Sequence, residues 1–199
     1  MSSFSGNLPW DFLVYVFSLL SLPNQPCYIF SDSDATQVYL TDLNPTTIDN
    51  LKYNIQLNQQ HTCPSGTPWT ERLNAGPINW EDSKTWPNEK IDFIIGSDLI
   101  YQSSIVPILK QVVLGLCQGE GTFLYVAPDI ESDIGRDGLE EFIQSMKATD
   151  GIELVSDAMA PKEYHANPLS SQDDDLCFLH FHELSSASYR LYEFKINIS

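Results

Sequence analysis

The stretch Ile91-Asp92-Phe93-Ile94-Ile95-Gly96-Ser97-Asp98-Leu99-Ile100-Tyr101 decides the fold of this chain. Four of its first five residues are apolar, and the run breaks at Gly96-Ser97-Asp98. A short apolar run that ends in turn residues is typical of a strand buried on both faces. Ligands of open parallel sheets bind at the carboxyl ends of the strands, so this strand would deliver Ser97, Asp98 and Tyr101 to a working edge. A core strand followed by an ordinary polar turn would give the same pattern.

Composition limits the class of protein and its partners. The 199 residues suit one domain, residues 1–199, and 42% hydrophobic content argues against disorder. Ten basic residues against 27 acidic ones leave a net charge of −17, without any basic cluster. We therefore expect the chain to bind neither nucleic acid nor membranes, and a basic partner or substrate fits the charge better.

The cysteines show no metal-ligand spacing, and His180 and His182, two residues apart on one strand face, form a pattern that more often does not bind metal, so no metal site is expected. Four scattered cysteines fit a reducing, cytoplasmic environment, with free thiols as the default. The residues concerned are Cys27, Cys63, Cys117, Cys177, His61, His165, His180 and His182.

Residues 1–37 form an atypical N-terminal segment. In the run 12–22 only Ser18 and Ser21 are polar, but eleven residues are too few to cross a bilayer. The first basic residue is Lys52, so the positive region of a signal peptide is missing. We expect this run to pack on the core as a helix that begins near Pro9 or Trp10.

Strand and helix patterns alternate along the rest of the chain. Residues 38–41 suit a strand, and Asn44 would cap a helix over 45–58 with one apolar stripe. Residues 59–77 are predicted as a loop and 78–80 as a short strand end or turn. The later predicted elements are a strand from Ile91, a helix over 106–116, a strand over 122–127, a helix over 138–149 capped by Asp137, a strand over 152–156, and an antiparallel pair of strands over 176–184 and 189–196. This order predicts an α/β fold with a mostly parallel sheet and an antiparallel C-terminal hairpin.

Several side chains near the predicted carboxyl edge could carry chemistry. Asp42 could accept hydrogen bonds from a ribose diol, or form an Asx turn that caps the next helix. Trp80 could stack on an adenine or pack in the core. Asp98 and Tyr101 could orient an amine and help to remove its proton, or serve as a helix cap and a buried phenol.

Glycine is missing where a nucleotide-type cofactor usually needs it. Residues 7 to 41 contain none, although the turn before the ribose-binding strand normally lets the backbone approach the ligand. This argues strongly against a nicotinamide dinucleotide, whose pyrophosphate needs such a cradle. It weakens an S-adenosylmethionine site less, because that ligand carries no phosphate.

Several motifs in order resemble those of the family 16 methyltransferases, the seven-strand, S-adenosylmethionine-dependent protein methyltransferases that mostly act on lysine. Thr41-Asp42-Leu43-Asn44, with the asparagines of the following helix, resembles their second-strand motif. Ile78-Asn79-Trp80 resembles their L-x-W element, and residues 92–101 resemble their D-x-I-x-(G/A)-(A/S)-D-x-x-Y signature. Residues 125–142 and 189–194 are similar to later strands and a helix of the family. The resemblance implies a Rossmann-like seven-strand sheet.

The resemblance also implies roles for single residues. Asp42 would bind the ribose of S-adenosylmethionine, Trp80 would lie beside the adenine, and Ser97 would line the cofactor pocket. Asp98 and Tyr101 would form the substrate-lysine edge. Trp10 loosely matches a tryptophan in the family's N-terminal helix that approaches the cofactor.

One departure from the family concerns its first strand. The family carries E-L-G-x-G-x-G there, whereas this chain has only about fifteen residues between Leu22 and Val38. We therefore expect the first strand to be missing or replaced. The motifs predict a protein-lysine methyltransferase; the alternative is an inactive remnant that binds another protein.

Overall fold

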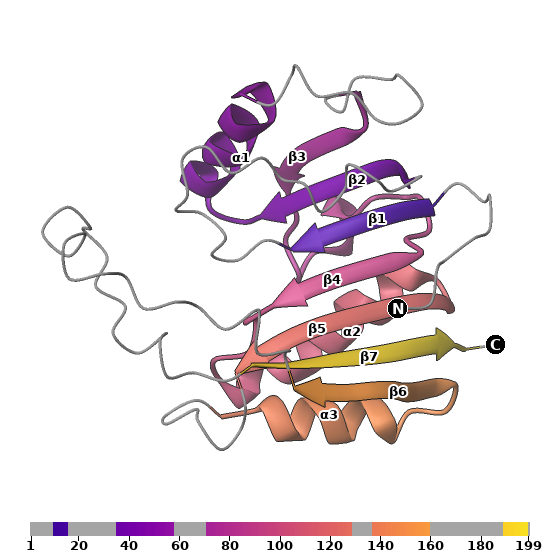
Figure 1. The fold of residues 1–199 in the computed structure, drawn as a ribbon. Helices are drawn as coiled ribbons and strands as arrows, with labels where there is room; N and C mark the ends of the chain where they lie inside the picture. The colour runs from indigo at the N-terminus through magenta and orange to yellow at the C-terminus, as the bar shows by residue number, and fades with distance from the viewer. Residues whose placement is uncertain (1–9, 16–34, 58–70, 129–136, 160–188, 199) are drawn as a thin grey trace, which may run out of the picture.

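The computed structural model describes residues 10–15, 35–57, 71–128, 137–159 and 189–198. Within these ranges, seven strands form one sheet in the order β3-β2-β1-β4-β5-β7-β6 (Figure 1). All neighbouring pairs are parallel except those of β7, which runs antiparallel to β5 and β6. The predicted Rossmann-like α/β fold is confirmed. The strands are β1 (Trp10–Tyr15), β2 (Ala35–Asp42), β3 (Leu73–Pro77), β4 (Phe93–Ser97), β5 (Glu120–Pro128), β6 (Ile152–Met159) and β7 (Tyr189–Asn197).

The first strand is present, which corrects two expectations. Residues predicted to begin a helix near Trp10 form β1 instead, and β1 is an interior strand of the sheet, between β2 and β4. Phe12 pairs with both Val38 and Phe93, so this strand has neighbours on each side. A strand with neighbours on both edges and layers on both faces has a continuous apolar sequence, and periodicity alone does not separate it from a buried helix.

Three α-helices in the described part of the chain cover parts of the two faces of the sheet. They are α1 (Pro45–Leu57), α2 (Val106–Cys117) and α3 (Leu139–Lys147). Figure 1 shows α1 beside β2 and β3, and α3 at the β6 end of the sheet. Leu51 of α1 packs on Val38 and Leu40, whereas Phe142 of α3 joins a larger core with Ile94 and Phe123. The two helical layers therefore stabilise opposite faces, because alternate strand residues point to opposite sides.

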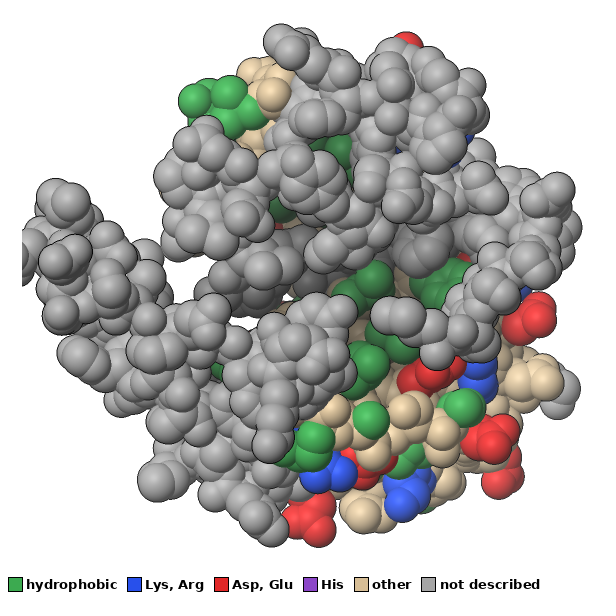
Figure 2. Space-filling model, viewed as in Figure 1, with side chains coloured by type: hydrophobic (Ala, Val, Ile, Leu, Met, Phe, Trp, Pro, Cys, Tyr) green, Lys and Arg blue, Asp and Glu red, His purple; other side chains and the backbone are tan. Residues whose placement is uncertain are grey.

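One face of the sheet points toward the viewer in Figure 1, and part of this face lies at the molecular surface in the space-filling view. Figure 2 shows hydrophobic side chains there among acidic and basic ones. Leu191 of β7 is 38% exposed, and the ammonium of Lys195 lies 5.8 Å from the ring centre of Phe93. Lys195 also donates to Thr122, so its long side chain covers apolar surface while its charge stays paired with polar groups.

Further sequence predictions meet different outcomes. The helix after Asn44 is confirmed, and the amide of Thr46 donates to the Asn44 side chain at 2.9 Å. The loop predicted over 59–77 is wrong at its end, where β3 adds an edge strand. Asp137 does not cap α3: Gly138 is the N-cap, and Asp137 accepts bonds from Ser103. The strand predicted over 176–184 lies outside the described residues.

The connection from β3 to β4 contains a short 3-10 helix (Ser83–Thr85) and two tryptophans, Trp80 and Trp86. Trp86 donates its indole N–H to the carbonyl of Asn79 at 2.8 Å. Its ring fills the space above Gly115 of α2, where an added Cβ would lie 2.4 Å from ring atom Cζ3. The absence of a side chain at Gly115 therefore lets this connection pack on α2.

In the described part of the chain, no helix is long and apolar enough to span a membrane.

Candidate active site

The predicted site residues of β2 and β4 lie at one edge of the sheet. Asp42 ends β2 and Ser97 ends β4, with β1 between the two strands. The arrows of β1 to β4 point to the same side in Figure 1, so these carboxyl ends share an edge. Asp98 follows Ser97 directly. The structure thus brings Asp42, Ser97 and Asp98 to the edge at which open α/β sheets bind ligands.

Asp42 is buried and uses one carboxylate oxygen locally. Its Oδ1 accepts the backbone N–H of Asn44 at 2.7 Å, which forms the Asx turn that was one of the two alternatives for Asp42. No described residue donates to Oδ2. The neighbouring hydroxyl of Thr41 is buried and has no hydrogen-bond partner among the described residues. A Cβ built on Gly76, which pairs with Thr41, would meet nothing within 4 Å. This end of β2 and β3 therefore combines open space with unused polar atoms.

Asp98 and Tyr101 meet in the turn that follows β4. The Tyr101 hydroxyl donates to Oδ2 of Asp98 at 3.3 Å, and Tyr101 is 45% exposed. Asp98 has a φ of 55°, in the left-handed region, and α2 begins only at Val106. The alternative of a helix cap at Asp98 and a buried Tyr101 is therefore wrong. The pair forms a polar, accessible group at the carboxyl edge.

Strand β5 holds this turn by three successive backbone N–H groups. The N–H of Asp98 donates to the carbonyl of Val126 at 2.8 Å. The N–H groups of Leu99 and Ile100 both donate to the hydroxyl oxygen of Tyr125, at 3.1 and 3.2 Å. A buried N–H without a partner costs about 1–3 kcal/mol, so Tyr125 stabilises the turn substantially.

Tyr125 was not among the site residues predicted from the sequence. Its ring packs against Phe123 and Phe142, and only 1% of the residue is exposed. Burial raises the pKa of the Tyr125 phenol above its ordinary value, and the charge of Asp98 adds to that shift. The available signal was a hydroxyl inside an apolar strand, since a buried tyrosine usually finds a hydrogen-bond partner for its oxygen.

The two tryptophans proposed for the cofactor have different outcomes. Trp80 follows the end of β3, is half-buried and packs against the larger core, and its contact with an adenine stays a prediction. Trp10 begins β1 and pairs with Ala35, at the amino end of the sheet. The N-terminal helix that would have carried Trp10 to the cofactor is therefore replaced by a strand that places its backbone at the opposite edge.

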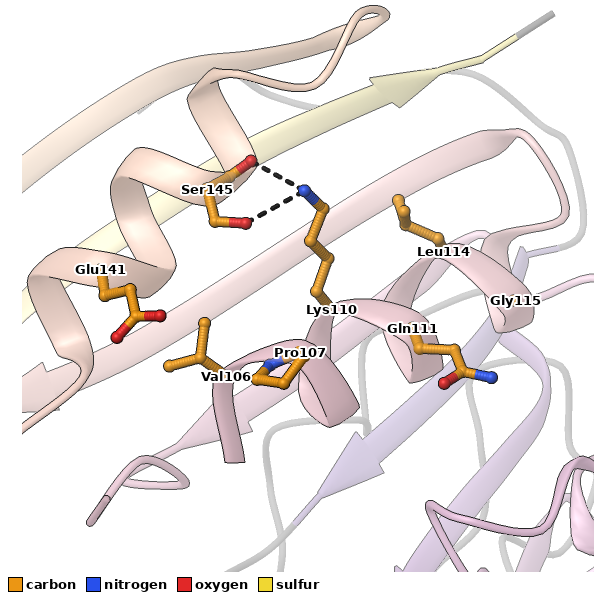
Figure 3. Close-up of a pocket in the computed structure, with 8 residues that line it drawn as sticks. All are labelled: Val106, Pro107, Lys110, Gln111, Leu114, Gly115, Glu141 and Ser145. Atoms are coloured by element: carbon orange, nitrogen blue, oxygen red, sulfur yellow. Dashed lines mark hydrogen bonds between the residues drawn. The ribbon is translucent and has the colours of Figure 1, made fainter. Parts of the chain in front are cut away.

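A separate open groove lies between the two helices of the larger core. Its volume is about 740 Å³, and its walls come from α2 and α3 (Figure 3). Lys110 points across it and donates to the carbonyl and hydroxyl of Ser145 at 2.9 and 3.0 Å. None of the predicted site residues lines this groove.

Among the described residues, no group of three or more His, Cys, Asp or Glu side chains is placed to hold a metal ion.

Comparison with known proteins identifies the sequence family and the fold. The model of a family described as lysine methyltransferase matches residues 28–149, more than half of the chain. No curated protein matches the chain in sequence. The region of the match contains Asp42, Ser97, Asp98 and Tyr101.

Solved structures with the same fold have little sequence in common with this chain. The tRNA m1G37 methyltransferase of M. jannaschii is 16% identical with a TM-score of 0.51; the match covers 96% of this chain but only 46% of that one. The (4+2)-cyclase SpnF is 10% identical with a TM-score of 0.64, covering 96% and 76% of the two chains. The plantazolicin methyltransferase BamL, solved with SAH, is 14% identical with a TM-score of 0.54, covering 95% and 77%. Because these proteins differ in their reactions, the likeness shows the fold alone.

Proposed function

Since this chain belongs to the lysine methyltransferase family, we propose that it transfers a methyl group from S-adenosylmethionine to a lysine side chain of another protein. The observation that supports this most is the Asp98–Tyr101 pair, which lies at the carboxyl end of β4 on the same sheet edge as Asp42. The net charge of −17 favours a partner with a basic, lysine-bearing surface.

The described residues suit the adenosine half of S-adenosylmethionine. Oδ2 of Asp42 has no described donor and can accept from a ribose hydroxyl, while Oδ1 keeps the carboxylate in place through Asn44. The open space beside Gly76 and the Thr41 hydroxyl, for which no described residue is a hydrogen-bond partner, lie at the adjoining strand ends. Ser97 is half-buried at the end of β4 and would line the pocket.

The methyl group of S-adenosylmethionine is already electrophilic, so the protein's part is to orient a neutral amine and remove its proton. Tyr101 and Asp98 have the groups for this task. The Asp98 carboxylate can accept a proton or hydrogen bond from the incoming amine, and the Tyr101 hydroxyl holds the carboxylate at 3.3 Å. Tyr101 is also exposed enough to contact a substrate protein.

Calorimetric titration with S-adenosylmethionine tests the cofactor site. Asp42→Ala should weaken binding at least about tenfold, because a hydrogen bond to a charged group contributes about 1.5–3 kcal/mol. Asp49→Ala, which changes an exposed aspartate of α1, is the matched control and should bind as the wild type does. Absence of binding by the wild type at millimolar ligand would contradict the proposed activity.

Methyl transfer itself can be followed with S-adenosylmethionine labelled on the methyl group and an extract of methyl-depleted proteins. Labelled methyl-lysine should appear after hydrolysis of the products, and Asp98→Asn or Tyr101→Phe should reduce it strongly. Glu140→Gln on the exposed side of α3 is the control. Label on RNA, or on an amino acid other than lysine, would reject the substrate class.

A second candidate function rests on one observation from the sequence. The connection from β1 to β2, residues 16–34, contains no glycine, whereas the family has a glycine-rich motif there. A chain that folds and binds a protein partner but neither binds S-adenosylmethionine nor transfers methyl groups would be a regulatory module derived from the enzyme. Turnover that is lost in Asp98→Ala would reject this alternative.

A further inference from the structure

The turn after β4 depends on a hydroxyl from the neighbouring strand. Leu99 and Ile100 are buried, and their backbone N–H groups both donate to the Tyr125 hydroxyl. These amides lie in the segment between Asp98 and Tyr101, where no regular helix or strand supplies carbonyl partners. A single phenol oxygen therefore satisfies both amides.

The space around this hydroxyl is closely fitted. A Cβ on Gly96 would lie 2.7 Å from Leu99 Cδ1 and 3.3 Å from Tyr125 Cδ2, so the glycine of β4 allows the leucine and the phenol ring to approach. The Tyr125 ring is held by a stacked contact with Phe123 and an edge contact with Phe142. The hydroxyl thus has a fixed position relative to the strand that precedes Asp98.

The far end of the same turn is tied to another element. The N–H and hydroxyl of Ser103 both donate to Asp137, at 3.2 and 3.1 Å. With Val126 accepting from Asp98, the turn is bonded at its start, at its middle and at its end. Only the middle bonds come from a fully buried side chain.

We infer that Tyr125 is a positioning residue that holds the Asp98–Tyr101 pair in its working geometry through the amides of Leu99 and Ile100. This inference rests on the proposed methyl transfer for its functional meaning, whereas the anchoring of the turn stands on geometry alone. Removing the hydroxyl would leave the ring packing in place and free the two amides.

Tyr125→Phe tests the inference with one atom removed. Amide exchange should speed up at least about tenfold at Leu99 and Ile100, while the amide of Thr122, which bonds to Asp92, changes much less. Tyr192→Phe removes the hydroxyl of a buried tyrosine that pairs with Tyr125 in the sheet, and should leave the exchange of both turn amides unchanged.

Kinetic measurements distinguish a positioning role of Tyr125 from a general loss of stability in the variant. In Tyr125→Phe, kcat should fall between about ten- and a hundredfold, because small displacements of reacting groups have effects of that size. The dissociation constant of S-adenosylmethionine should change less than about twofold. Unchanged kcat in a chain whose wild type methylates lysine would overturn the positioning role.

The exchange measurement keeps the inference testable without activity. If the wild type transfers no methyl group, the proposed function fails while the amide data still decide whether Tyr125 anchors the turn. Fast exchange at Leu99 and Ile100 in the wild type, or equal exchange in wild type and Tyr125→Phe, would overturn the anchoring itself.

Discussion

At the scale of single residues, substitutions of Asp98 can distinguish the effect of its left-handed backbone on stability from the effect of its carboxylate on methyl transfer. Its φ of 55° is tolerated by Gly and Asn but strained for Ala. Asp98→Ala should therefore lower the free energy of unfolding by about 1 kcal/mol more than Asp98→Asn or Asp98→Gly does. Urea unfolding measures this difference.

Gln102→Ala is a control for Asp98→Ala within the same turn. Gln102 has a φ of −149°, which any residue adopts, so its replacement should change the free energy of unfolding little. Equal stability of the three Asp98 variants would show that the left-handed conformation does not govern this turn. All three should lose methyl transfer, because each removes the carboxylate.

The sequence predicts the identity of the site residues better than their geometry. The break at Gly96-Ser97-Asp98 after an apolar run places Asp98 at a carboxyl edge, and the structure agrees. It does not reveal the left-handed backbone or the role of Tyr125, because both depend on how β5 lies against β4. That contact joins residues about 26 positions apart, which no local pattern encodes.

At the scale of elements, β1 offers a sharp test of strand against helix. Phe12→Pro removes a backbone donor in a strand with neighbours on both sides, where proline is not tolerated. A helix that began near Trp10 would accept proline in its first turn. We expect Phe12→Pro to prevent folding, and Phe12→Ala, which keeps the donor, to fold with reduced stability.

Circular dichroism and urea unfolding distinguish these outcomes for the Phe12 variants. Cooperative unfolding of Phe12→Pro with the same midpoint as Phe12→Ala would contradict the assignment of β1 as an interior strand.

Strand β1 was not predicted from the sequence because its apolar run lacks alternation. Strand β3 was not predicted because Leu73-Asn74-Ala75-Gly76-Pro77 is poor in strand-forming residues. The amphipathic helices α1 and α3 were recovered because a helix exposed on one side keeps its apolar period.

At the scale of the whole molecule, the sheet joins a smaller core and a larger one. Val38, Leu40 and Leu51 form the smaller core, near Asp42. The larger core runs beneath α2 and α3 and contains Tyr125 and Cys117. The turn that carries Asp98 is anchored to the larger core, while Asp42 belongs to the strand of the smaller one. Strand β1 connects the two halves and so supports the geometry of the entire site.

The Cys117 thiol and the Tyr125 phenol, both buried in the larger core, make the protein less stable as the pH becomes alkaline. Burial raises the pKa of the Cys117 thiol from 9.0 to about 12, although the charge of Lys90 opposes this. Burial also raises the pKa of the Tyr125 phenol above its ordinary value of 10.0. Above pH 9.0 the unfolded chain loses the thiol proton while the folded chain keeps it, so the free energy of unfolding falls as pH rises.

The contribution of Cys117 can be isolated by comparing the wild type with Cys117→Ala. Between its ordinary and its raised pKa, the thiol should lower the free energy of unfolding by about 1.4 kcal/mol per pH unit. Urea unfolding at about pH 8 and about pH 10.5 should show a shallower decline in Cys117→Ala, whose stability at the lower pH is somewhat reduced by the lost packing. Parallel declines in the two proteins would mean that the thiol titrates alike in the folded and unfolded chains. Because Tyr125 keeps its raised pKa in this variant, the remaining slope belongs in part to the phenol that anchors the turn after β4.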